Sequence, residues 1–191
     1  MKLLVVVAST REERVGPVVA QWFVDRARAH GGFELQLADL KELGLPLLDE
    51  PKHPRLRQYT KDHTKAWSAM VDGADAYVFV TPEYNYSMSP ALLNAIDYVL
   101  HEWAYKPAGF VSYGGASGGM RSVQMTKQVL NSVKVVPVLE AVAIPFFMNF
   151  VGKDGPGTFV PGETVDKAAA VMLDELHRWA EALAPMRAPR P

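Results

Sequence analysis

The sequence predicts an α/β fold built on a parallel sheet, and three observations support this prediction. Short apolar runs alternate regularly with longer segments of helical periodicity, a pattern typical of a parallel sheet with helices on both faces. The first run, residues 3–8, is apolar throughout, as expected of a strand that is buried on both sides. With 191 residues, 49% of them apolar, the chain is long enough to form a single domain with a sizeable core.

The elements follow one another in a simple order. The predicted strands cover residues 3–8, 33–37, 76–80, 109–113 and 133–138. The predicted helices cover residues 16–31, 60–73, 89–103, 117–131 and 164–183. The first helix is expected to begin at Gly16-Pro17, because proline is favoured at the first helical position. Residues 39–59 contain three prolines and many charges and are expected to form a loop.

Five strands and five helices in a chain of this length favour the flavodoxin-like order over the larger dinucleotide-binding order. The predicted fold is therefore a flavodoxin-like, doubly wound, five-stranded parallel sheet with helices on both faces. We expect residues 1–184 to form one domain. The proline-rich residues 185–191 are expected to be a disordered or frayed tail.

Composition excludes several classes of partner and site. A net charge of −1 gives no basic surface for nucleic acid, and no apolar run approaches the roughly 20 residues of a membrane span. The chain has no cysteine, which excludes disulfides, thiolate metal sites and cysteine nucleophiles. The five histidines lack metal-ligand spacing. We therefore expect a cytoplasmic protein that binds no metal.

Three loops are expected to meet at one edge of the sheet, because the carboxyl ends of parallel strands lie together. The first, residues 9–16, combines Ser9, Arg11 and Arg14 with the backbone amides of Val15 and Gly16 at a helix start. Hydroxyls, guanidinium groups and free amides of this kind suit a phosphate group. The alternative is a helix cap with solvated charges.

The second loop, residues 81–89, carries two tyrosines and an asparagine in three consecutive positions, 84–86. These side chains and the backbone amides around them suit a flat heteroaromatic ring and its carbonyl groups. The alternative is a plain turn capped by Ser89 before a helix. That alternative does not account for the aromatic residues.

The third loop, residues 112–121, contains four glycines, which allow a backbone to approach a ligand closely. The spacing G-x-G-x-x-G of dinucleotide sites is absent. Residues 115–119 match G-x-S-x-G, the nucleophile elbow of hydrolases, so a serine hydrolase using Ser117 is an alternative. Such an enzyme would need a downstream histidine. His177, the only histidine after Ser117, falls within the last predicted helix.

Taken together, the three loops resemble those of the NADPH-dependent FMN reductase family, which includes chromate, quinone and azo reductases. The most specific part is Pro82-Glu83-Tyr84-Asn85-Tyr86-Ser87 followed by residues 90–97. Ser9-Thr10-Arg11 and residues 114–121 support the resemblance in the right order and spacing. The resemblance extends from Leu3 to about Pro145.

The resemblance implies a homodimer or homotetramer with one FMN per subunit and NADPH as the reductant. The implied cofactor-binding residues are Ser9, Arg11, Arg14, Val15 and Gly16 at the phosphate, Pro82, Glu83, Tyr84, Asn85 and Tyr86 along the isoalloxazine, and Ser112, Gly114 and Gly115 at its other edge. Glu13 and Ala8 stand where relatives often have glycine. A carboxylate beside a phosphate is unfavourable, so Glu13 is expected to lower the affinity for FMN, an effect that Arg11 and Arg14 offset.

The implied reaction passes a hydride from NADPH to bound FMN. Two electrons then pass to a quinone, an azo compound, a metal oxyanion or free flavin. The flavin carries the chemistry, so no catalytic side chain is predicted. A flavin-binding electron carrier without a substrate of its own is the main alternative. The small net charge argues against it, because small carriers steer their partners with strong fields.

The predicted helix at 89–103 also suggests an assembly. It carries an apolar stripe that is wider than contact with one sheet face requires, made of Leu92, Leu93, Ile96, Val99, Leu100 and Trp103, with Tyr98 and His101 alongside. An apolar excess of this kind suggests a subunit interface. The alternative is a helix that is deeply buried within one chain.

Overall fold

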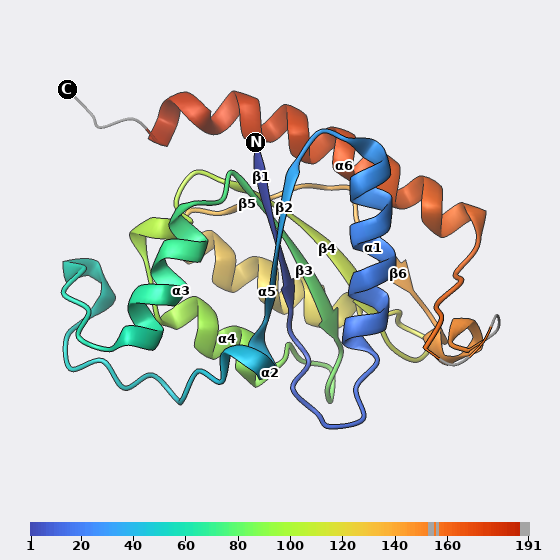
Figure 1. Ribbon diagram of the computed structural model, residues 1–191, viewed down its shortest axis with the longest axis horizontal. Helices are drawn as coiled ribbons and strands as arrows, with labels where there is room; N and C mark the ends of the chain where they lie inside the picture. Colours follow the sequence, from blue (N-terminus) through green and yellow to red (C-terminus); the bar gives the residue numbers. More distant parts are fainter. Residues whose placement is uncertain (153–154, 156, 188–191) are drawn as a thin grey trace.

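The computed structural model describes residues 1–152, 155 and 157–187. It contains a central parallel sheet in the order β2-β1-β3-β4-β5, with β6 also paired to β4 (Figure 1). The strands are β1 Lys2–Val7, β2 Glu34–Asp39, β3 Ala76–Pro82, β4 Pro107–Tyr113, β5 Val136–Pro137 and β6 Val142–Ile144. Every pairing in the sheet is parallel. This is the flavodoxin-like order, and it confirms the predicted fold class.

Helices cover both faces of the sheet. The α-helices are α1 Gly16–His30, α2 Leu40–Leu43, α3 Asp62–Asp72, α4 Pro90–Asp97, α5 Met120–Ser132 and α6 Glu163–Leu183. The short 3-10 helices are η1 Pro54–Leu56, η2 His101–Trp103, η3 Phe147–Phe150 and η4 Ala184–Arg187. None of the described helices is long and apolar enough to cross a membrane.

Alternation along β1 divides the core into two clusters, one on each side of the sheet. Leu3 and Val5 belong to the cluster that includes the buried faces of α1 and α6. Leu4 and Val6 belong to the cluster that includes the buried residues of α3, α4 and α5. Successive side chains of a strand point to opposite faces, so an entirely apolar strand is what a sheet covered on both sides requires.

The first helix has the predicted ends. It starts at Gly16, with a proline at its first turn, and Gly31 closes it in the left-handed conformation with a φ of 75°. The segment 39–59 differs from the prediction of a loop, because it contains α2 and η1. The Asp39 side chain caps α2 by accepting a hydrogen bond from the Lys41 amide, and Gly44 ends it with a φ of 57°.

The predicted helix at 89–103 is shorter in the structure, where α4 ends at Asp97 and η2 follows. Most of its apolar stripe is buried within the chain, and the rings of Trp67 and Trp103 pack edge to face at 5.9 Å. Burial within one chain therefore accounts for most of the stripe, although Leu93 is 38% exposed. The predicted assembly stays a prediction.

Two other segments differ from the sequence-based expectations. The fifth strand is divided, because β5 pairs with the start of β4 at Pro107 and β6 pairs with its end, from Val111. Residues 185–187 of the predicted frayed tail lie instead in η4, where Arg187 forms an ion pair of 2.9 Å with Asp75. Residues 188–191 of that predicted tail lie outside the described residues.

Candidate functional site

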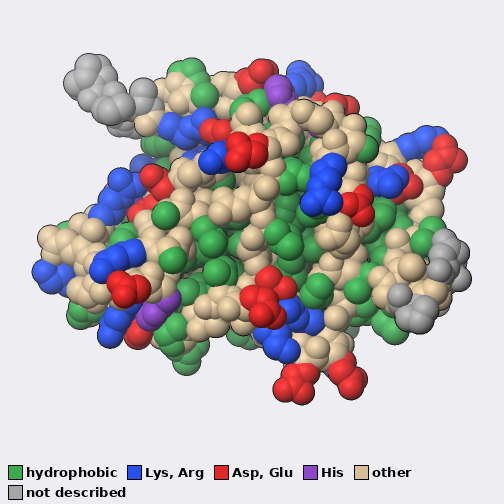
Figure 2. Space-filling model, viewed as in Figure 1, with side chains coloured by type: hydrophobic (Ala, Val, Ile, Leu, Met, Phe, Trp, Pro, Cys, Tyr) green, Lys and Arg blue, Asp and Glu red, His purple; other side chains and the backbone are tan. Residues whose placement is uncertain are grey.

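A cavity of about 200 Å³ lies where the loops after β1, β3 and β4 meet, at the lower edge of the sheet in Figure 1. The predicted site residues that line it are Ser9, Arg11, Arg14, Val15, Pro82, Glu83, Tyr84, Gly114 and Gly115. Figure 2 shows charged side chains of both signs over this edge. The fold therefore brings the three predicted loops together around one hollow.

The cavity also includes residues that were not predicted to bind a ligand, namely Glu13, Tyr113 and Phe147. Tyr113 and Phe147 pack edge to face with ring centroids 5.1 Å apart. Four predicted residues do not line the cavity: Gly16, Asn85, Tyr86 and Ser112. Gly16 lies directly behind it, whereas Asn85 and Tyr86 lie at an exposed loop tip.

The amino terminus of α1 is suited to bind an anion. Its cap residue, Val15, provides no side-chain hydrogen bond, and the first turn contains no acidic residue. The first backbone amides of a helix have no partner within the helix, and the helix dipole places partial positive charge beside them. An uncapped helix start that borders a cavity suits a phosphate group.

Two buried hydroxyl groups reinforce this interpretation. Ser9 is 1% exposed and Tyr113 is 3% exposed, and apart from each other neither hydroxyl has a hydrogen-bond partner among the described residues. A buried polar group without a partner costs free energy. Burial also raises the pKa of Tyr113, so this phenol keeps its proton and can donate it to a ligand oxygen.

The two arginines of the first loop differ in their surroundings. The Arg14 guanidinium donates to the Ser9 carbonyl at 2.9 Å and forms a close ion pair with Asp39. Its side chain is only 9% exposed, so Arg14 mainly fixes the loop against the end of β2. Arg11 is exposed and has no ion pair among the described residues. Arg11 is therefore the free cation of this loop.

The second loop is a tight turn at residues 84–87. Tyr84 and Ser87 exchange backbone hydrogen bonds of 3.1 and 2.9 Å. Between them, Asn85 and Tyr86 both have positive φ, at 49° and 65°. Two such residues in a row make a type I′ turn. Tyr84 is half-buried at the cavity, and burial raises the pKa of its hydroxyl although Arg11 and Arg14 oppose the shift.

Glu83 lies between the second and third loops. Its carboxylate accepts a hydrogen bond from the Ser117 hydroxyl at 2.8 Å, one from the Arg121 backbone amide at 3.1 Å and one from Arg121 Nε at 2.7 Å. Burial acts to raise the pKa of Glu83, but the hydrogen bonds from Arg121 and Ser117 outweigh it and the pKa is lowered. Glu83 thus caps the start of α5, whose own cap residue is Gly119.

The Glu83 cap distinguishes the amino terminus of α5 from that of α1 as a place for an anion to bind. The positive end of α5 is already compensated by the carboxylate of Glu83. The positive end of α1 has no such partner. An incoming anion is therefore expected at α1, which agrees with the position of Arg11.

The geometry around Ser117 does not support a hydrolase. Its hydroxyl donates to Glu83 and accepts from the Gly119 amide at 3.3 Å. The imidazole of His177 contacts Glu181 at 3.8 Å and packs on Phe33, far along the chain from this loop. The Ser117 hydroxyl links the third loop to Glu83 of the second loop, and none of its described hydrogen-bond partners is a histidine that could activate it.

The third loop approaches the cavity through its backbone. The Ser112 hydroxyl donates to the Gly118 carbonyl at 2.7 Å, so its role is to hold the loop rather than to line the cavity. Gly114 donates its amide to the Ile144 carbonyl, and the Gly115 carbonyl accepts from two amides. Nothing lies within 4 Å of the side-chain position of Gly115, which leaves open space beside the backbone at this wall.

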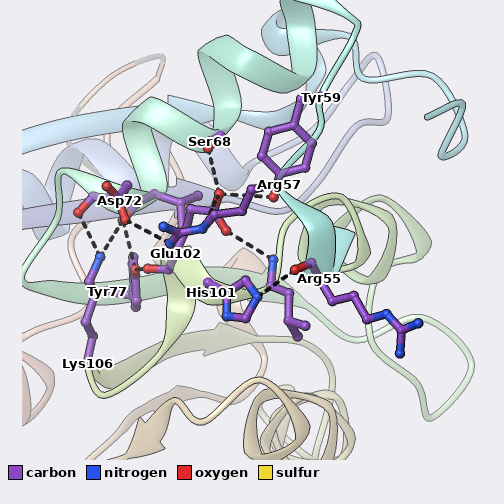
Figure 3. A network of polar contacts seen from close by, with 11 residues as sticks. Arg55, Arg57, Tyr59, Ser68, Asp72, Tyr77, His101, Glu102 and Lys106 are labelled. Atoms are coloured by element: carbon purple, nitrogen blue, oxygen red, sulfur yellow. Dashed lines mark hydrogen bonds and ion pairs between the residues drawn. The ribbon is translucent and has the colours of Figure 1, made fainter. Parts of the chain in front are cut away.

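Another cavity, of about 570 Å³, lies at the opposite edge of the sheet. Figure 3 shows the network beside it, in which buried Glu102 accepts hydrogen bonds from Tyr59 at 3.0 Å and Ser68 at 2.8 Å. Lys106 donates to the carbonyls of Val71 and Asp72, and burial lowers its pKa to about 8. These contacts join η2 to α3 and stabilise the fold.

Comparison with known proteins agrees with this geometry. Residues 1–149 match the sequence profile of NADPH-dependent FMN reductases. The chain belongs to this family. An NAD(P)H-dependent FMN reductase of Schizosaccharomyces pombe is 39% identical over 148 residues, covering 75% of this chain and 74% of the relative. A second NAD(P)H-dependent FMN reductase, from Nectria sp., is 34% identical over 189 residues, covering 95% and 88%.

Solved structures share the architecture. A flavoenzyme NAD(P)H:acceptor oxidoreductase from Paracoccus denitrificans superposes with a TM-score of 0.73 at 23% identity, covering 95% of this chain and 98% of that one. At this identity the likeness concerns the fold alone. Other relatives in sequence are named as quinone oxidoreductases and an azoreductase. The chain is therefore an enzyme of the NAD(P)H-dependent FMN reductase type.

The residues present fit the cofactor of the family. Two buried hydroxyls with no other described partner than each other, an uncapped helix start and a free arginine border one hollow, and a phosphate group would satisfy all of them. Sequence reasoning missed Tyr113 and Phe147. Tyr113 lies at the end of an apolar strand, and its position directly before Gly114 was the one available signal.

Proposed function

We propose that this FMN reductase family member is an NADPH-dependent oxidoreductase that reduces a small-molecule acceptor, such as a quinone, an azo compound, a metal oxyanion or free flavin. The observation that carries the proposal is the buried pair of hydroxyls, Ser9 and Tyr113, which have no partner but each other among the described residues and lie beside the uncapped start of α1. The names of the relatives support the class of acceptor.

The phosphate end of FMN would be held by the first loop. The hydroxyls of Ser9 and Tyr113 would donate to phosphate oxygens, and the amides of Val15 and Gly16 would add those of the helix terminus. Arg11 supplies the compensating charge. Each such hydrogen bond to a charged group contributes about 1.5–3 kcal/mol. Glu13 also borders the cavity, and its carboxylate lowers the affinity for the phosphate.

The ring end would lie between the second and third loops. Pro82, Glu83 and Tyr84 form one wall of the cavity, and Gly114 with Gly115 forms the other. Glycine allows the backbone to approach a flat ring closely. Because burial raises the pKa of Tyr84, its hydroxyl stays protonated and serves as a donor at the rim.

When bound, FMN supplies the redox chemistry by accepting a hydride from the nicotinamide and delivering two electrons to the acceptor. The protein residues bind, orient and exclude water, and none of them needs to act as an acid or a base. The two alternatives have less support. An electron carrier does not match the names of the relatives, and Ser117 has no histidine among its described hydrogen-bond partners.

Steady-state kinetics with NADPH and a quinone test this proposal. One shared site requires the first product to leave before the second substrate enters, so double-reciprocal plots at several quinone concentrations should be parallel. Intersecting lines would mean that both substrates bind together and would contradict the shared site. An FMN-loaded protein without turnover would be a carrier.

A further inference from the structure

Glu83 and Arg121 join two walls of the cavity that are 38 residues apart in the chain. The Arg121 side chain meets the Glu83 carboxylate through both Nε, at 2.7 Å, and Nη2, at 2.6 Å. Glu83 is only 8% exposed at its side chain. Both nitrogens contact the same oxygen, Oε1, while Oε2 accepts from the Ser117 hydroxyl and the Arg121 amide. Charge-assisted contacts to both oxygens are strong, so they fix the relative position of the β3–α4 and β4–α5 loops.

The same arginine holds a strained residue. Tyr86 occupies the second central position of the type I′ turn with a φ of 65°, where glycine is strongly preferred and a bulky residue is unfavourable. The Arg121 guanidinium lies 3.7 Å from the centroid of the Tyr86 ring. This cation–π contact compensates for the backbone conformation and explains why an exposed aromatic side chain stays at the turn.

We propose that Glu83 and Arg121 form a clasp that sets the spacing between the two walls and so positions the flavin ring. This inference rests on the proposed function. Arg121 is a positioning residue, because it does not line the cavity and acts through Glu83 and Tyr86, whereas Glu83 also lines the cavity itself. The clasp lies at the ring end of the cavity and Arg11 lies at the phosphate end. The clasp should therefore affect the binding of the ring, and Arg11 the binding of the phosphate.

This division provides a test with two ligands, FMN and riboflavin, which share the ring and differ in the phosphate. Fluorescence titration of the apoprotein gives both dissociation constants. The Arg121→Ala and Glu83→Gln substitutions should raise both constants by the same factor, about tenfold, the size expected for losing a hydrogen bond to a charged group. Arg11→Ala should raise the constant for FMN alone.

A matched control is Arg26→Ala. Arg26 lies on α1, its side chain is 45% exposed against 46% for Arg121, and it pairs with Asp166 at 3.7 Å. This variant should change neither constant. If Arg121→Ala does not fold, Arg121→Lys keeps the charge but loses the two-point contact and the stacking, and it should show a smaller rise for both ligands.

Hydrogen exchange of the apoprotein gives a second readout. In Arg121→Ala the amides of Tyr84 and Ser87 should exchange faster while those of the central strands stay unchanged. The clasp is overturned if Arg121→Ala and Arg121→Lys leave the constant for riboflavin within twofold of the wild type, or raise only that for FMN. If the wild type binds neither FMN nor riboflavin, the proposed function fails instead.

Discussion

The Ser9 hydroxyl lies only 2.1 Å from the point that a side-chain carbon on Gly16 would occupy. The Tyr113 hydroxyl lies 3.0 Å from the same point. Both oxygens are buried and have no partner but each other in the described part of the chain, so Gly16 leaves room for the two groups that we assign to the phosphate. Because Gly16 also starts α1, one position joins the helix terminus to the hydroxyl pair.

Gly16→Ala should therefore impair cofactor binding and also lower stability. The added methyl group pushes the Ser9 hydroxyl aside, and overpacking of this kind costs about 1–3 kcal/mol of stability. The affinity for FMN should fall by about tenfold or more, as expected for the loss of a hydrogen bond to a charged group. Titration with FMN measures the affinity, and denaturant unfolding measures the stability.

Gly115→Ala is the matched control for stability, because nothing lies within 4 Å of its side-chain position. Its free energy of unfolding should stay close to that of the wild type. Wild-type FMN affinity in Gly16→Ala would contradict the assignment of Ser9 and Tyr113 to the phosphate.

The two arginines of the first loop should separate binding from stability. Arg11→Ala removes an exposed, unpaired cation and should weaken FMN by about 1.5–3 kcal/mol with little change in stability. Arg14→Ala removes the ion-pair partner of Asp39, which is 16% exposed and keeps only the hydrogen bond from the Lys41 amide among its described contacts. It should cost on the order of 2 kcal/mol of stability, less than the 3–5 kcal/mol of a fully buried pair. Equal stability losses in the two variants would show that this distinction is wrong.

The lowered pKa of Glu50 predicts that the stability of the protein depends on pH. Burial acts to raise its pKa, but hydrogen bonds from the Thr60 and Lys61 amides outweigh it and lower the pKa from 4.5 to about 2. A carboxyl whose pKa is lower in the folded protein stabilises it above the unfolded pKa, and this contribution is lost as the pH falls. The stability advantage of the wild type over Glu50→Gln should thus shrink between about pH 5 and pH 2.

Chemical denaturation at a series of pH values measures this advantage. Glu12→Gln, at an exposed residue of the first loop, is the control and should show no such trend. A constant difference between wild type and Glu50→Gln across this range would refute the role given to the two amides.

The predicted assembly requires a solution measurement. Apolar side chains remain exposed around α4, with Leu47 at 85%, Leu48 at 42% and Leu93 at 38%. Exposed apolar residues that lie close together suit a subunit interface. Light scattering should give a dimer or tetramer at micromolar concentration, and Leu93→Glu should lower the mass. A mass of 21.1 kDa for the wild type would refute the assembly.

Much of the fold could be predicted because its signals are local. An apolar run such as residues 3–8 marks a buried strand, and Gly16-Pro17 marks the start of α1. The segment 39–59 was wrongly predicted to be a loop, because its prolines and charges obscured the short helix α2, which Asp39 caps. The split of the last strand into β5 and β6 depends on tertiary pairing with β4, which no local pattern encodes.

The candidate site shows the same division. The loops could be located, because each follows a strand and their edge is fixed by parallel topology. Which carboxylate each arginine pairs with could not be predicted. Arg14 pairs with Asp39 across 25 residues and Arg121 pairs with Glu83 across 38. Ion pairs between residues this far apart leave no local pattern in the sequence. Only the structure therefore distinguishes Arg11 as the free cation of the first loop.

Anaerobic mixing of the FMN-loaded protein with NADPH tests the central claim most directly. The proposed oxidoreductase should lose the visible absorption of oxidised flavin on addition of one equivalent of NADPH and regain it when a quinone follows. A protein that binds FMN but keeps this absorption with both NADPH and NADH would be an electron carrier. A protein that binds no FMN would contradict the account of the cavity itself.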